Sequence, residues 1–186
     1  MRCPWAEQTD IEREWHDMEW GRVLHDDRQL FELLSLKGAQ AGLAWRTVLR
    51  KRGAYRRLFH DFDIARVAAM DDDELALAAC DRGIIRHRLK IASVRANARI
   101  IVAMAGKGES FADLLWSFTG GKIIRNRHVM AADVPMRSTE SDAMSHELQR
   151  RGFRFAGTAI CYGVMQAAGM VNDHLVTCDC YRRPLR

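Results

Sequence analysis

The sequence contains little proline and no long apolar segment. Three of its 186 residues are proline, so a proline-rich linker is excluded and a mostly helical chain is expected. No apolar run approaches the roughly 20 residues that a membrane-spanning helix needs. The N-terminal residues also lack the apolar core of a secretory signal. These absences predict a cytoplasmic protein with no membrane partner.

Cysteine is scarce as well, because the chain has five cysteines without the spacing of a disulfide framework. Unpaired thiols are typical of a reducing compartment, where they stay available to a metal ion. Hydrophobic residues make up 48% of the chain and charged residues 28%, as in soluble globular domains. The length predicts one domain over residues 1–186, and we expect a monomer. The net charge of +5 is compatible with a polyanionic partner.

Helical periodicity and capping signals occur along most of the chain. Asp26 or Asp27 can cap a first helix, and Asp71 with Glu74 forms a capping-box pattern before a later one. No stretch alternates with period two for long enough to require a strand, and residues 120–133 are expected to form a loop. The sequence therefore predicts an all-α domain, with helices over residues 27–41, from 43 or 44, 75–80, from 86 or 87 to 104, 113–118, 142–151 and 158–168.

Two cysteine–histidine pairs lie at opposite ends of the chain. His174 precedes Cys178 by four residues, which would put both on one face of a helix. A structural zinc site normally takes four ligands of these types. A His-x3-Cys pair alone is more often an ordinary packed pair. With the N-terminal pair added, the sequence predicts one structural Zn²⁺ that joins residues 1–20 to residues 170–186, bound by Cys3, His16, His174 and Cys178.

A glycine turn at Gly83 separates two of the expected helices. This arrangement over residues 72–104 has the shape of a helix-hairpin-helix element, in which backbone N–H groups and a helix N-terminus bind phosphate. The alternative is an ordinary pair of helices with a solvated basic face, since the second glycine common in such hairpins is absent. The predicted phosphate-binding residues are Gly83, Arg86 and Arg88.

A lysine lies on the apolar stripe of the first predicted helix. Lys37 shares this stripe with Leu30, Leu33 and Leu34. A lysine in such a position is costly unless it faces a pocket or pairs with an acid. The nearby glycines and Trp45 favour a small cavity with aromatic walls. The alternative is that Lys37 lies at the edge of the stripe and extends to water.

The motifs together resemble the bacterial 3-methyladenine DNA glycosylase I family of the helix-hairpin-helix glycosylase group. The matching segments span the chain: RCPW at 2–5, HDMEWG at 16–21, QAGLAW at 40–45, GIIRHR at 83–88, LWSF at 115–118, RRGF at 150–153 and VNDH at 171–174. The resemblance implies an all-helical fold and the same zinc quartet. It also implies hydrolysis of the N-glycosidic bond of 3-methyladenine in alkylated double-stranded DNA, without lyase activity.

The resemblance further assigns roles around a pocket for the extruded base. Trp45 matches a pocket tryptophan, Trp15 replaces one pocket tyrosine, and Glu12 occupies another tyrosine position. Leu43 matches a residue that wedges into the gap left by the flipped base. Aromatic walls suit a cationic base through stacking and cation–π attraction.

Lys37 is the main departure from that family, because it occupies the position of a glutamate that reads the base edge. Two like charges about 4 Å apart repel by roughly 4 kcal/mol at an effective dielectric of about 20. A charged lysine would therefore oppose a cationic base. Three resolutions are open: burial neutralises Lys37, Lys37 pairs with Glu12, or the substrate is a different base.

Three functions follow from these patterns. The leading hypothesis is a 3-methyladenine glycosylase that Lys37 weakens or retunes. The second is a non-catalytic relative that binds damaged DNA through the basic hairpin and Leu43. The third and weakest is a zinc-stapled helical domain with a protein partner.

Overall fold

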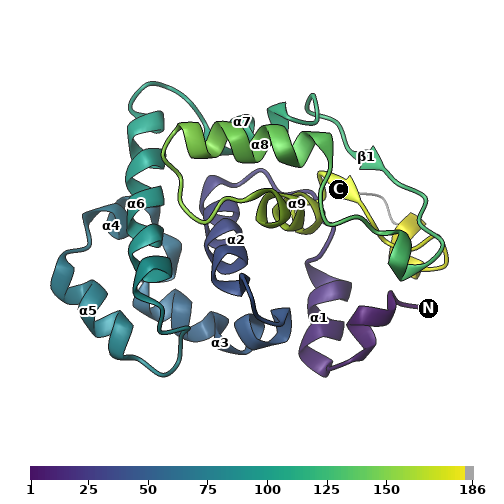
Figure 1. The fold of residues 1–186 in the computed structure, drawn as a ribbon, viewed down its shortest axis with the longest axis horizontal. Coiled ribbons are helices and arrows are strands. Elements are labelled where there is room, and N and C mark those ends of the chain that lie inside the picture. Colours follow the sequence, from purple (N-terminus) through teal and green to yellow (C-terminus); the bar gives the residue numbers. More distant parts are fainter. Residues whose placement is uncertain (183–186) are drawn as a thin grey trace.

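The computed structural model describes residues 1–182, and helices predominate (Figure 1). The α-helices are α1 Asp10–Met18, α2 Asp27–Gln40, α3 Trp45–Leu58, α4 Ile64–Ala69, α5 Asp72–Cys80, α6 Arg88–Ala105, α7 Phe111–Ser117, α8 Thr139–Arg150 and α9 Thr158–Ala167. Short 3₁₀ helices are η1 Pro4–Glu7, η2 His60–Phe62, η3 Ala131–Asp133 and η4 Asp179–Arg182. None of the helices in this described part is long and apolar enough to cross a bilayer.

Helix α2 forms the centre of the molecule (Figure 1). Its Leu30, Phe31 and Leu34 are almost fully buried against the surrounding helices α3, α6, α7 and α9. Burying one such side chain stabilises the fold by about 1.5–3 kcal/mol. The apolar stripe predicted for this helix is therefore confirmed. Burial of the stripe also sets the position of the last turn of α2, which carries Lys37 and Gln40.

Two of the predicted helix starts are confirmed by their hydrogen bonds. The Asp26 carboxylate accepts from the Gln29 amide at 2.8 Å, and Asp71 and Glu74 form a reciprocal capping box. The predicted start of α8 at residue 142 was wrong, because Ser138 caps the helix and Thr139 is its first residue. The Ser141 amide donates to the Ser138 hydroxyl, so the helix begins three residues earlier than expected.

The prediction of an all-α fold is wrong in one detail, because the structure of residues 1–182 contains two short strands. Strand β1 Ile124–Arg125 pairs in parallel with β2 Val171–Asn172. Strand β1 lies within the expected loop over residues 120–133, and β2 lies near the end of the chain. Each strand has two residues, too short for an alternating pattern in the sequence. This ladder holds the C-terminal segment beside the connection between α7 and α8 (Figure 1).

The two ends of the described chain lie at one side of the molecule (Figure 1). The amino group of Met1 pairs with the Asp179 carboxylate, and the Asp179 amide donates to the Met1 carbonyl at 2.9 Å. The predicted approach of the N-terminal segment to the C-terminal segment is therefore present in the fold.

Candidate functional site

The four predicted metal ligands lie together in a buried cluster. Their donor atoms all lie within 4.8 Å of one another. His174 Nδ1 is 3.7 Å from Cys3 Sγ and 3.6 Å from Cys178 Sγ, and His16 Nε2 is 3.4 Å from Cys178 Sγ. Zinc–sulfur and zinc–nitrogen bonds of about 2.3 and 2.0 Å in a tetrahedron separate neighbouring ligand atoms by roughly 3.5–3.8 Å. The cluster therefore has the donor set and spacing of a tetrahedral metal site.

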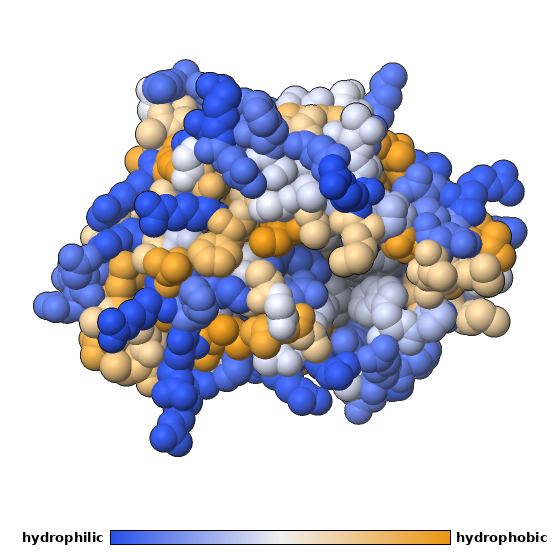
Figure 2. All heavy atoms as spheres, in the orientation of Figure 1, coloured by the Kyte–Doolittle hydropathy of each residue, from blue (hydrophilic) through white to orange (hydrophobic). Residues whose placement is uncertain are grey.

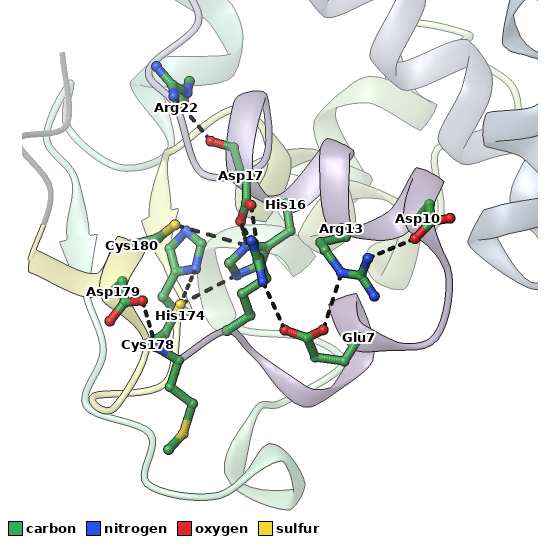
Figure 3. A network of polar contacts seen from close by, with 12 residues as sticks. Glu7, Asp10, Arg13, His16, Asp17, Arg22, His174, Cys178, Asp179 and Cys180 are labelled. Carbon is green, nitrogen blue, oxygen red and sulfur yellow. Dashed lines mark hydrogen bonds and ion pairs between the residues drawn. The ribbon is translucent and has the colours of Figure 1, made fainter.

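A loop, not a helix, brings His174 and Cys178 together (Figure 3). The prediction that they lie one helical turn apart was wrong, because strand β2 leads into a series of turns at this point. The His174 amide donates to the Asn172 side chain at 3.2 Å, and the Cys178 amide donates to the Leu175 carbonyl at 2.8 Å. These local bonds fold the loop back, so that both side chains face the N-terminal segment.

Neighbouring residues orient the two imidazoles. Asp17 Oδ1 lies 2.9 Å from His16 Nδ1 (Figure 3), a partner that holds Nε2 toward the thiols. Gly21 has a φ of +76°, and a Cβ there would lie 2.9 Å from His174 Nε2. Hydrogen bonding to the Cys3 thiol lowers the pKa of Cys178, which favours the thiolate that metals bind.

A cavity of about 620 Å³ lies beside this cluster and contains the residues predicted for the base pocket. Segments far apart in the sequence form its walls: α1, the end of α2, the start of α3, η3 and α9. Figure 2 shows a hollow in the face of the molecule that is turned toward the viewer, with apolar atoms at its rim. The predicted residues that line it are Glu12, Trp15, Lys37, Leu43 and Trp45. The structure brings these five residues together around one cavity.

The Lys37 side chain lies inside the cavity, over the face of Trp45. Its Nζ atom is 3.9 Å from the centre of the Trp45 ring and donates to Gln40 Oε1 at 3.3 Å. Burial lowers the pKa of Lys37 to about 7. Within residues 1–182 it forms no ion pair, so the proposed pairing with Glu12 is absent. Burial therefore neutralises Lys37 in part near pH 7, and the side chain stays charged at lower pH.

The two tryptophans form an edge-to-face pair, with ring centres 5.4 Å apart. Behind the pocket, the Arg52 guanidinium lies 5.2 Å from the centre of the Trp15 ring. Buried Glu32 accepts from Arg52 Nε at 2.7 Å, and Glu19 accepts from Nη1 at 2.7 Å. No sequence motif marks Arg52 as a residue of the pocket. In the fold, Arg52 packs behind the Trp15 wall of the pocket. It also lines a second, larger cavity of about 760 Å³, together with Glu19 and Glu32.

Leu43 lies at the rim of the pocket with 41% of its surface exposed. It follows Gly42, whose φ of +78° requires a conformation that glycine adopts readily. Lys90 of α6 donates to the carbonyls of Ala39 at 3.0 Å and Ala41 at 2.7 Å. This lysine therefore ties the turn that carries Leu43 to the second helix of the basic hairpin.

We expect Lys90→Met to lower the catalytic efficiency of base release about tenfold. The two charge-assisted hydrogen bonds are each worth roughly 1.5–3 kcal/mol, and their loss would loosen the turn at Leu43. Lys107→Met is the matched control, because Lys107 is exposed and does not line the pocket. Steady-state kinetics on methylated DNA measure the effect. Equal kcat/KM values for both variants would contradict this role for Lys90.

Helices α5 and α6 lie on either side of Gly83 and contact each other, but the Gly83 amide is already engaged. It donates to the Asp81 side chain, and a Cβ at this position would lie 2.8 Å from Ala54 Cβ. Close packing against α3 thus explains the glycine. Arg86 and Arg88 are exposed next to the N-terminus of α6, where a phosphate is favoured.

Comparisons with known proteins identify the family of this chain. The chain matches the family described as methyladenine glycosylase over residues 5–182. The chain belongs to the methyladenine glycosylase family. It is 46% identical over 180 residues to DNA-3-methyladenine glycosylase 1 of Escherichia coli (strain K12), covering 97% of this chain and 96% of that protein. This member of the 3-methyladenine DNA glycosylase I family is therefore a DNA repair glycosylase.

Solved structures of this family have the same fold. A crystal structure of 3-methyladenine DNA glycosylase I superimposes with a TM-score of 0.95 at 46% identity, over 97% of this chain and 99% of the other. A single-residue variant of 3-methyladenine DNA glycosylase I in complex with 3-methyladenine gives 0.93 at 29% identity, over 98% of each chain. The family fold thus extends over nearly all of this glycosylase.

Proposed function

We propose that this enzyme excises 3-methyladenine from alkylated double-stranded DNA, and that Lys37 weakens the reaction. The observation that carries the proposal is the cavity with Trp15 and Trp45 in its walls and Leu43 at its rim. Indole faces attract an electron-poor cationic ring, and an exposed leucine is suited to fill the gap that a flipped nucleotide leaves. A relative of known structure binds 3-methyladenine.

The reaction follows from the chemistry of the methylated base. Methylation at N3 gives the base a positive charge, so it leaves as a neutral molecule when the C1′–N9 bond breaks and its electron pair passes to N9. Water adds to C1′ of the sugar and loses a proton, which makes this a hydrolysis without lyase chemistry. The pocket contributes by holding the base outside the helix.

DNA binding in this proposal involves the hairpin of α5 and α6. Arg86 and Arg88 contact phosphates, together with the N-terminus of α6, while Lys90 supports the turn at Leu43. The hairpin acts as the helix-hairpin-helix element of the glycosylase group. We propose that one protein molecule binds one duplex.

One structural zinc ion completes the proposal. Cys3, His16, His174 and Cys178 would hold it, and as a closed four-ligand site it would supply stability rather than catalysis. The site joins α1, which carries Glu12 and Trp15, to the C-terminal segment. The reduced thiols are compatible with a cytoplasmic location.

Chromatography of the bases released from methylated duplex DNA tests the function. We expect 3-methyladenine to appear faster than by spontaneous loss. A second candidate, a non-catalytic protein that binds damaged DNA, is favoured by the Lys37 amine, which occupies the face of Trp45. Tight binding to abasic duplex with no base released at any pH would support this candidate and reject the first.

The burial of Lys37 predicts the pH dependence of this excision. Burial lowers the pKa of Lys37 to about 7, so below pH 7 the side chain is charged and repels the cationic base. Above pH 7 it is neutral and the repulsion is lost. We therefore expect kcat/KM for 3-methyladenine, which reports groups of the free enzyme, to rise as pH increases through about 7. A profile that is flat from pH 6 to 8 would contradict this.

A further inference from the structure

The pocket carries a hydrogen-bond donor and an acceptor on separate walls. Lys37 from α2 provides amine hydrogens, of which one is directed to Gln40. Glu12 from α1 is 5% exposed, and its Oε2 accepts from the Thr9 hydroxyl at 2.7 Å. The two groups both line the cavity without forming an ion pair within residues 1–182. Both groups can therefore contact a ligand that occupies the cavity.

A lysine in a base pocket favours one charge type of leaving group. When a glycosidic bond breaks, the electron pair goes to the departing base, so a cationic base leaves neutral and a neutral base leaves as an anion. A nearby ammonium opposes the binding of the first and stabilises the negative charge that develops on the second. Lys37 is thus suited to bases that are neutral before the bond breaks.

The hydrogen-bonding pattern selects among neutral bases. A 6-oxopurine presents a carbonyl oxygen next to a ring N–H, which are an acceptor for Lys37 and a donor for Glu12. A 6-aminopurine presents an amino donor next to a ring nitrogen acceptor, the opposite order.

We propose that this pocket accepts neutral 6-oxopurines, with hypoxanthine as the simplest example, and that Lys37 stabilises the base as it departs. The inference rests on the proposed function, since it assumes that the same cavity receives the flipped nucleotide. The C1′–N9 bond breaks, its electron pair passes to the base, and Lys37 donates a hydrogen bond to the carbonyl oxygen that gains negative charge. Water adds to C1′ and releases a proton, and the base is finally protonated from solvent.

Ordinary guanine is also a 6-oxopurine, but it is held in a stable pair. Extrusion costs least for a mismatched or damaged base, so a hypoxanthine opposite thymine is easier to flip than a paired guanine. The cavity of about 620 Å³ has room for a purine. We therefore expect a duplex with ordinary guanine at the test position to release no base.

Other ionisable side chains line the same cavity as Lys37. Glu12 faces the cavity from α1, and Asp173 faces it from the segment after β2. Asp173 is engaged by the Tyr162 hydroxyl at 2.7 Å and the Gln166 amide at 2.9 Å. Within the described chain, Cys3 and, from α9, Tyr162 are the other titratable residues of the lining, while Trp45 of α3 carries no charge. Lys37 is thus the basic group of this cavity among the described residues, and release of a neutral base should fall as pH rises through about 7.

The experiment measures single-turnover release of hypoxanthine and 3-methyladenine at pH 6 and pH 8. The unaltered protein is compared with Lys37→Met, which keeps an unbranched side chain one atom shorter and removes the donor, and with Lys107→Met as the matched control. We expect the unaltered protein to release hypoxanthine, several-fold faster at pH 6 than at pH 8. Removing a charge-stabilising donor costs roughly 100-fold in rate, so Lys37→Met should lose most of this release while Lys107→Met keeps it.

The outcomes separate this inference from the proposed function. Release of 3-methyladenine without hypoxanthine would overturn the inference and leave the proposed function intact. Release of hypoxanthine without 3-methyladenine would support the inference and reject the proposed substrate. Equal hypoxanthine release by Lys37→Met and the unaltered protein would also overturn the inference. The pH comparison uses the unaltered protein, so it tests the inference even if Lys37→Met does not fold. A rate of hypoxanthine release that rises toward pH 8 would overturn the inference.

Discussion

Lys37→Glu is expected to release 3-methyladenine about 10- to 100-fold faster than the unaltered protein at pH 6. The substitution removes a charge that opposes the cationic base and introduces one that attracts it. At about 4 Å and an effective dielectric near 20, each like or opposite pair is worth roughly 4 kcal/mol. The base loses its positive charge as the C1′–N9 bond breaks, so only part of that figure remains in the transition state. Each 1.36 kcal/mol of transition-state stabilisation corresponds to a tenfold rate increase.

The effect on 3-methyladenine should depend on charge rather than on space. Lys37→Met is the matched variant, since it removes the positive charge without adding a negative one. We expect its rate to lie between those of the unaltered protein and Lys37→Glu. Single-turnover assays on methylated duplex DNA give the three rates. If Lys37→Glu were no faster than the unaltered protein at pH 6, electrostatic opposition by Lys37 would be rejected.

Cys178→Ser is expected to abolish zinc binding and to lower the melting temperature by roughly 10–20 °C. The proposed ion joins residues far apart in sequence, 171 positions for Cys3 and His174. A cross-link that closes so long a loop contributes about 4–5 kcal/mol through chain entropy. For a chain of this length, 1 kcal/mol shifts the melting temperature by about 2–4 °C. Base release should fall as well, because α1 carries Trp15 and Glu12.

Elemental analysis and thermal melts of the purified protein measure both effects. Cys80→Ser is the matched control, because Cys80 is exposed and lies outside the buried cluster. We expect this control to keep one zinc per chain and an unchanged melting temperature. One zinc per chain in Cys178→Ser would exclude the proposed ligand set.

The sequence was most informative where local chemistry determines structure. Asp26 and Asp71 were predicted as helix caps because their side chains bond amides three residues ahead, and both bonds are present. The stripe of α2 was read correctly because its leucines repeat with helical spacing. Helix α1 was missed because its buried face holds Glu12, Trp15 and His16, a mixture whose burial depends on the pocket and the metal cluster.

Parts of the site depend on contacts that sequence order does not reveal. Arg52 supports Trp15 only because Glu32 and Glu19 anchor it from two other segments. Lys90 reaches the carbonyls of Ala39 and Ala41 across about 50 residues of sequence. The bend that brings His174 to Cys178 is set by a two-residue strand and side-chain bonds, which leave no periodic signal.

The most direct test is the rate at which Lys37→Glu releases 3-methyladenine from methylated duplex DNA, divided by the rate for the unaltered protein. This ratio should be well above one at pH 6, where the lysine is charged. At pH 8 the lysine is mostly neutral, so the ratio should be several-fold smaller. A ratio of one at both pH values would contradict the claim that the Lys37 amine and the extruded base share one cavity.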